Sequence, residues 1–201
     1  MDAIIGILAL LVIIALFVWD LGGGTAALFF GRKLPWLWFA LAASEFIARI
    51  LNVALYREYD VVRGLGSLAG AILAAVLAIL LQRRFASVVL VIGGFLAAGL
   101  SAIQVLGPLL NPAPEWLVIG LLLATGVAGA IWARRDPSTA TIVFSALVGA
   151  GILADSLLKW LSLEEAYRFQ VYAILALAGI GVQLWMRRRE ARAALPQTEG
   201  A

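Results

Sequence analysis

The chain has 201 residues, of which 64% are hydrophobic and 13% are charged, and its mean hydropathy is +1.03. Ordinary soluble domains carry about 25% charged residues, so this composition excludes such a domain and indicates a membrane protein. The net charge is +3, and the basic residues cluster at the ends of apolar stretches. This pattern predicts membrane orientation and lipid neighbours, and gives no reason to expect a nucleic-acid partner.

Seven apolar stretches are each long enough to cross a membrane as a helix, which takes roughly 20 residues. They cover residues 3–30, 34–55, 64–82, 86–110, 114–133, 139–162 and 169–187. The sequence therefore predicts an all-α, polytopic integral membrane protein with seven transmembrane helices. We expect them to form a single domain over residues 1–189, followed by a short cytoplasmic tail over residues 190–201.

The first stretch is longer than a membrane crossing requires. As a straight helix, residues 3–30 would extend about 42 Å, against a hydrocarbon core of about 30 Å. Consecutive glycines weaken a helix, so Gly22, Gly23 and Gly24 predict a break. Asp20 then lies at this break or near the inner interface.

The basic residues predict the orientation of the chain. Ten of the fifteen Lys and Arg residues fall on one side of the predicted helices: Arg32, Lys33, Arg83, Arg84, Arg134, Arg135, Arg187, Arg188, Arg189 and Arg192. By the positive-inside rule this side is cytoplasmic. We therefore expect a multi-pass protein of the plasma or inner membrane with its N-terminus outside and its C-terminus inside.

The basic residues also recur at a regular interval. Lys33, Arg84 and Arg135 are each 51 residues apart, which predicts a leading helix followed by three helical hairpins of about 51 residues. Internal duplication is one explanation. The other is that any two helices joined by a short loop have about this length.

Small residues recur at the spacing at which membrane helices pack closely. The pairs are Gly66 with Gly70, Gly94 with Ala98, Gly126 with Ala130, and Gly149 with Leu153, beside Gly151. They predict close contacts between helices of the same chain, and the same faces are candidates for a homo-oligomer or a protein partner.

An acidic and a basic residue one helical turn apart, Glu45 and Arg49, interrupt the second apolar stretch. An ionised side chain near the bilayer centre costs about 2.5–3.5 kcal/mol, so both must face protein or water. Glu45 lies twelve residues past Lys33, or about 18 Å along a helix, which is close to the midplane. Arg49 and Asn52 continue along the same face toward the outside.

Further polar residues are predicted in the outer half of the membrane. Gln104 and Asp155 each lie twenty residues past a cytoplasmic arginine, and Lys159 follows Asp155 by one turn. The candidate intramembrane polar cluster is therefore Asp20, Glu45, Arg49, Asn52, Gln104, Asp155 and Lys159.

Two interpretations of this cluster stay open. Ion pairs Glu45–Arg49 and Asp155–Lys159 would hold together a non-enzymatic scaffold or accessory subunit. Alternatively, an outward-facing polar pocket floored by Glu45 would serve a translocator of a small solute, a proton or an ion.

Catalysis is not expected. The chain has no Cys and no His, and no combination of nucleophile, base and metal ligands is evident in the sequence. We therefore expect no catalytic residues, no cofactor and no metal.

Three motifs carry a resemblance to a known family. They are Phe29–Lys33, with an aromatic-Gly-basic turn, Val91–Leu96 and Ser138–Gly151. With the helix spacing, they resemble the seven-helix family typified by transmembrane protein 198 and its bacterial relatives, over about residues 5–162. The resemblance implies a seven-helix fold and a role as a membrane scaffold, which in animals is associated with Wnt signalling. Glu45, Arg49 and the Gly22 to Gly24 segment depart from the family pattern.

Overall fold

The computed structural model describes residues 18–54, 60–106, 114–162 and 164–193, and every regular element in these ranges is helical. The elements are η1 (Trp19–Gly23), α2 (Gly24–Phe30), α3 (Pro35–Ala54), α4 (Asp60–Leu106), α5 (Glu115–Arg135), α6 (Pro137–Trp160), η3 (Glu165–Tyr167) and α7 (Arg168–Ala193). The prediction of an all-α protein is confirmed for this part of the chain. Most of the predicted first helix, residues 3–17, lies outside the described residues.

Four helical segments are long and apolar enough to cross a membrane. They are Ala86–Leu106 in α4, Trp116–Arg135 in α5, all of α6 and all of α7, and they coincide with four of the seven predicted stretches. Large apolar side chains line the exposed face of α5 at helical spacing: Trp116, Ile119, Leu123, Val127 and Ile131. Such a surface is suited to lipid and not to water, so the chain is a helical membrane protein.

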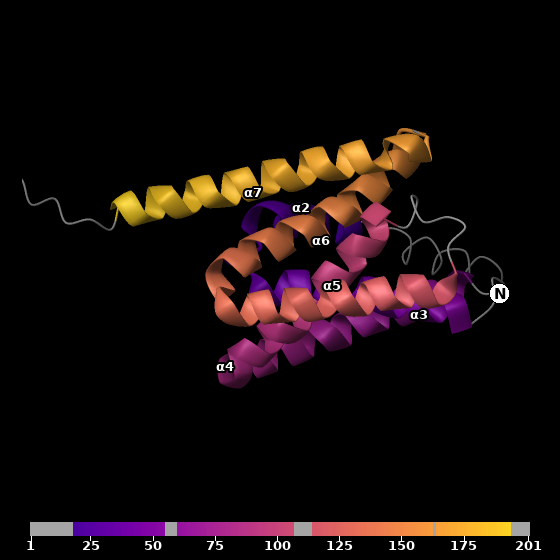
Figure 1. Ribbon diagram of the computed structural model, residues 1–201, viewed down its shortest axis with the longest axis horizontal. Coiled ribbons are helices and arrows are strands. Elements are labelled where there is room, and N and C mark those ends of the chain that lie inside the picture. The colour runs from indigo at the N-terminus through magenta and orange to yellow at the C-terminus, as the bar shows by residue number, and fades with distance from the viewer. Residues whose placement is uncertain (1–17, 55–59, 107–113, 163, 194–201) are drawn as a thin grey trace, which may run out of the picture.

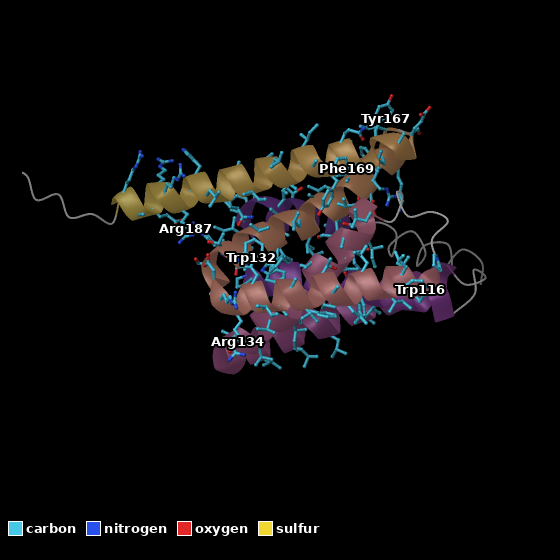
Figure 2. All side chains as sticks on the ribbon, viewed as in Figure 1. Trp116, Trp132, Arg134, Tyr167, Phe169 and Arg187 are labelled. Atoms are coloured by element: carbon cyan, nitrogen blue, oxygen red, sulfur yellow. The ribbon has the colours of Figure 1, made fainter. Side chains whose placement is uncertain are left out.

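The ends of the bundle differ in chemistry. Figure 2 shows Trp116, Tyr167 and Phe169 toward one end, and Arg134 and Arg187 toward the other. Arg134 and Arg187, which are distant in sequence, therefore lie toward the same end of the bundle (Figure 2), as the positive-inside interpretation expects. The number of crossings and the orientation stay predictions.

Helix α4 is continuous but bends back on itself. Its Gly70 lies against Ile47 of α3, whereas its Gly93 lies against Trp38 of α3. A straight helix separates residues 70 and 93 by about 34 Å, but residues 38 and 47 by only about 13 Å, so both contacts require a fold-back between them. The sequence predicted a loop at Arg83 and Arg84, and the backbone there is helical because neighbouring residues include no glycine or proline to end a helix.

Helix α6 is the centre of the bundle and contacts η1, α2, α3, α4, α5 and α7. In Figure 1 it lies between α7 and α5. Glycine permits a close contact with the backbone of α2, since a Cβ at Gly149 would lie only 2.6 Å from the backbone N of Leu28. A Cβ at Gly126 of α5 would likewise lie 2.7 Å from Phe95 of α4. These two predicted small-residue positions therefore pack helices within the chain.

The predicted break at Gly22 to Gly24 is a change of helix type. Residues Trp19–Gly23 form a π-helical turn, and α2 follows directly and ends at Phe30. The wider π turn keeps the backbone hydrogen-bonded within the helix, so the chain alters its path here without an interruption. The end of α2 at Phe30 coincides with the end of the first predicted apolar stretch.

Candidate functional site: two polar clusters

The first polar cluster joins the ends of α6 and α7. The carboxylate of Asp155 in α6 pairs with Arg168, the first residue of α7, at 3.2 Å, and the two side chains are 26% and 25% exposed. The sequence had paired Asp155 with Lys159, and this assignment is corrected. The short connection between the helices returns Arg168 beside Asp155, while Lys159 is exposed at the end of α6.

Gln104 of α4 reaches the same cluster. A cavity of about 10 Å³ is lined by Gln104, Val105, Gly151, Ala154, Asp155, Arg168, Phe169 and Tyr172. Gly151 leaves room for the Gln104 side chain, because an added Cβ would lie 2.7 Å from the Gln104 amide nitrogen. Thus the structure brings together Gln104 and Asp155, two of the residues that the sequence placed in the outer half of the membrane.

Tyr172 adds a hydroxyl that sequence reasoning did not single out. The side chain is 6% exposed, and its hydroxyl lies beside Ser101 without a hydrogen bond of standard geometry to any described residue. Buried polar groups are rarely left in this state. The cavity is about large enough for one water molecule, which takes roughly 10–15 Å³.

The remaining predicted residues are not part of this cavity. Glu45 is half-buried on α3 and does not line it. The side chains of Asp20, Arg49 and Asn52 lie outside the described part of the structure. The pocket floored by Glu45 therefore stays a prediction.

The second polar cluster surrounds Gln183 of α7, which is fully buried. Its Nε2 donates to the carbonyl of Leu28 at 2.8 Å and to the hydroxyl oxygen of Ser145 at 3.0 Å. Its Oε1 accepts from the backbone N–H of Arg32 at 3.1 Å. The amide thus satisfies backbone groups at the C-terminal end of α2 that have no partner within that helix.

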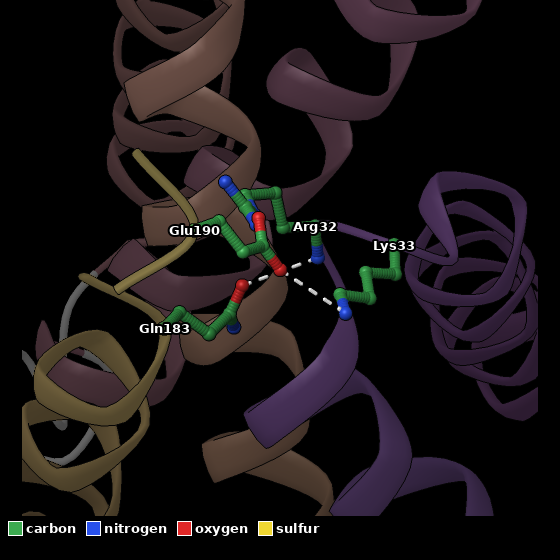
Figure 3. A network of polar contacts seen from close by, with 4 residues as sticks. All are labelled: Arg32, Lys33, Gln183 and Glu190. Carbon is green, nitrogen blue, oxygen red and sulfur yellow. Dashed lines mark hydrogen bonds and ion pairs between the residues drawn. The ribbon is translucent and has the colours of Figure 1, made fainter. Parts of the chain in front are cut away.

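Ion pairs reinforce the same end of α2. Glu190 of α7 pairs with Arg32, and its other carboxylate oxygen lies 3.1 Å from the Lys33 ammonium. Figure 3 shows Glu190 facing both basic residues, with Gln183 beside them. Sequence reasoning missed Gln183, although an amide deep within the apolar stretch 169–187 was a signal for a buried partner.

Neither cluster is suited to hold a metal. In the described ranges no three acidic side chains come together as a cation site, and the carboxylates of Asp155 and Glu190 are both engaged by basic residues. The chemistry that the clusters offer is hydrogen bonding and charge pairing between helices.

Comparison of the chain with protein-family models, with curated proteins and with solved structures finds no match. The class that the fold and these clusters define is a helical integral membrane protein with internally paired polar groups. The resemblance to the transmembrane protein 198 family stays a prediction.

Proposed function

We propose that the protein is a non-enzymatic integral membrane protein that acts as a scaffold or accessory subunit in the plasma or inner membrane. In this proposal seven helices cross the bilayer, with the N-terminus outside and the C-terminus inside. The observation that carries the proposal is that the polar groups at the helix interfaces bind other parts of the same chain. Gln183 binds Leu28, Ser145 and Arg32, and Asp155 binds Arg168.

The packing around these groups supports the same function. Gly149 admits the backbone of α2 at a distance that excludes even a methyl group, and Gly151 lies against the Gln104 side chain. The cavity beside Asp155 has room for about one water molecule. A bundle closed in this way is suited to present its outer faces to partners, because Gln183 and Asp155 are already engaged within the chain.

A second candidate is a translocator of a small solute, a proton or an ion. It is favoured by the gathering of Gln104, Asp155 and Tyr172 around one cavity, and by the Tyr172 hydroxyl that lacks a standard hydrogen bond to a described residue. Intramembrane polar residues that face a shared space often mark a pathway. This function requires an opening of the helices around Gly151.

The two functions are distinguished by the composition of the protein in its native membrane. Extraction into polymer nanodiscs without detergent, followed by native mass spectrometry, gives the mass of the intact assembly. The scaffold proposal expects a second protein at a fixed ratio. A strictly monomeric chain without a partner contradicts it.

Transport is tested in parallel with purified protein in liposomes. A flux of protons or potassium that is present in the wild type and is abolished by Asp155→Asn supports the translocator. The control is Lys159→Gln, which alters an exposed charge one turn away. If the wild-type protein gives no flux above that of empty liposomes, the translocator candidate loses its support.

A further inference from the structure

A cavity opens at the basic end of the bundle, beside the first residues of α3 and α6 and the part of α4 that begins at Ala86. Its volume is about 280 Å³, near the lower end of the range for ligand cavities, which start at roughly 300 Å³. Most of its wall is apolar and consists of Pro35, Ala86, Val89, Leu90 and Pro137. Three helical segments thus border an open cavity at the end of the bundle where Arg134 and Arg187 lie (Figure 2).

The polar part of the lining consists of Arg32, Ser138 and Thr141. Both hydroxyls already donate within the α6 region: Ser138 to the Asp136 carboxylate at 2.9 Å, and Thr141 to the carbonyl of Pro137 at 2.7 Å. Arg32, whose guanidinium also pairs with Glu190, is the cationic residue of this lining and so its partner for an anion.

The rim of the cavity carries a net positive charge. Arg32 and Lys33 share the single carboxylate of Glu190 (Figure 3), so one positive charge is left over. Arg134 and Arg135 are two further exposed cations at the end of α5, three and two residues before Pro137 of the lining. The nearby carboxylate of Asp136 faces the start of α6, where it accepts a hydrogen bond from the backbone N–H of Thr139 at 3.2 Å.

We propose that this cavity binds an anionic phospholipid, with an acyl chain against the apolar wall and the headgroup phosphate at Arg32. A soluble anion would make no use of the apolar wall, and a neutral lipid would make no use of the charge. Basic cavities between helices on the positive side of a membrane protein suit anionic headgroups. The site does not depend on whether the bundle acts as a scaffold or as a translocator.

The first test is lipid selectivity of the purified full chain. Native mass spectrometry in delipidating detergent measures retention of phosphatidylglycerol and of phosphatidylcholine with the same acyl chains. We expect one phosphatidylglycerol molecule to be retained about fivefold more than phosphatidylcholine, the factor for about one surface charge. Equal retention of the two lipids overturns the proposal.

A matched pair of variants tests the cavity itself. Ala86→Leu fills the space between the three helices, whereas Ala124→Leu adds the same atoms on the exposed face of α5. We expect the first variant to lose retention of phosphatidylglycerol at least fivefold and the second to retain it. Equal retention by both variants assigns the lipid to the general surface and contradicts the cavity site.

A second pair separates lipid binding from a purely structural ion pair. Arg32→Gln and Glu190→Gln both break the ion pair between Arg32 and Glu190. Only the first removes the phosphate partner, while the second leaves Arg32 more available. We expect retention to fall about fivefold in Arg32→Gln and to stay or rise in Glu190→Gln. A parallel loss in both variants overturns the assignment of Arg32.

Discussion

Replacing Gln183 by leucine tests the polar cluster that joins α2, α6 and α7. The substitution keeps a side chain of similar size but removes the donor to Leu28 and Ser145 and the acceptor for the Arg32 N–H. A hydrogen bond contributes a net of about 0.5–1.5 kcal/mol to stability, and the average within membranes is about 0.6 kcal/mol. Three such bonds predict a loss of about 2–3 kcal/mol in the free energy of unfolding.

Unfolding of the full chain in mixed micelles by increasing SDS, followed by circular dichroism, measures this loss. Gln170→Leu is the matched control, because the same residue type lies exposed near the start of α7. Ser145→Ala is expected to lose less than Gln183→Leu, since the amide keeps its bond to Leu28. If Gln183→Leu unfolds at the same SDS fraction as Gln170→Leu, the reasoning about buried hydrogen bonds is refuted.

Three further predictions concern packing, charge and pH. Gly149→Val places atoms against Leu28 and should destabilise the bundle by about 1–3 kcal/mol or more. Gly181→Val is the control, because nothing lies within 4 Å of an added Cβ there, and it should change stability little. Equal effects of the two variants in SDS unfolding would contradict the contact between Gly149 and Leu28. In a double-mutant cycle, Asp155→Asn and Arg168→Gln should show a coupling of about 1 kcal/mol in the free energy of unfolding. If the two losses of stability are simply additive, the ion pair does not stabilise the protein. The hydrogen bonds from Thr139 and Ser138 lower the pKa of Asp136 below its usual value of 3.8, so its stabilising effect is present above about pH 4 and is lost as the pH falls through the lower folded-state pKa. The difference in melting temperature between wild type and Asp136→Ala should therefore shrink below about pH 4, and a constant difference from pH 6 to 3 would show that the carboxylate charge is not involved.

Hydropathy and charge predicted the class of this protein because both act locally along the chain. A run of apolar residues must form a helix in lipid, since each backbone polar group then bonds within its own segment. For that reason the starts of α5, α6 and α7, near residues 115, 137 and 168, could be placed before the structure was known, whereas the predicted boundary near residue 86 lies within the continuous α4.

The contacts between helices could not be read in the same way. Asp155 is paired with Arg168 and not with Lys159 because the α6–α7 connection, rather than helical spacing, sets which charges meet. Gln183 was overlooked because its partners, Leu28 and Ser145, are 155 and 38 residues away in sequence. The sequence could predict that Gln104 and Asp155 lie close together, because the depth of each residue in the membrane follows from its distance along the helix from the basic side.

Accessibility of a single cysteine at Ala154 tests the central claim, that the interior polar groups are closed off within the bundle. Ala154 lines the cavity beside Asp155 and is 1% exposed, whereas Glu164 is exposed in the connection to α7. The chain has no native cysteine, so a membrane-impermeant maleimide reports on the introduced position alone. The account predicts that Glu164→Cys is labelled in intact membranes while Ala154→Cys reacts only after denaturation. Labelling of Ala154→Cys in intact membranes at a rate close to that of Glu164→Cys would show a water-filled pathway and contradict the account.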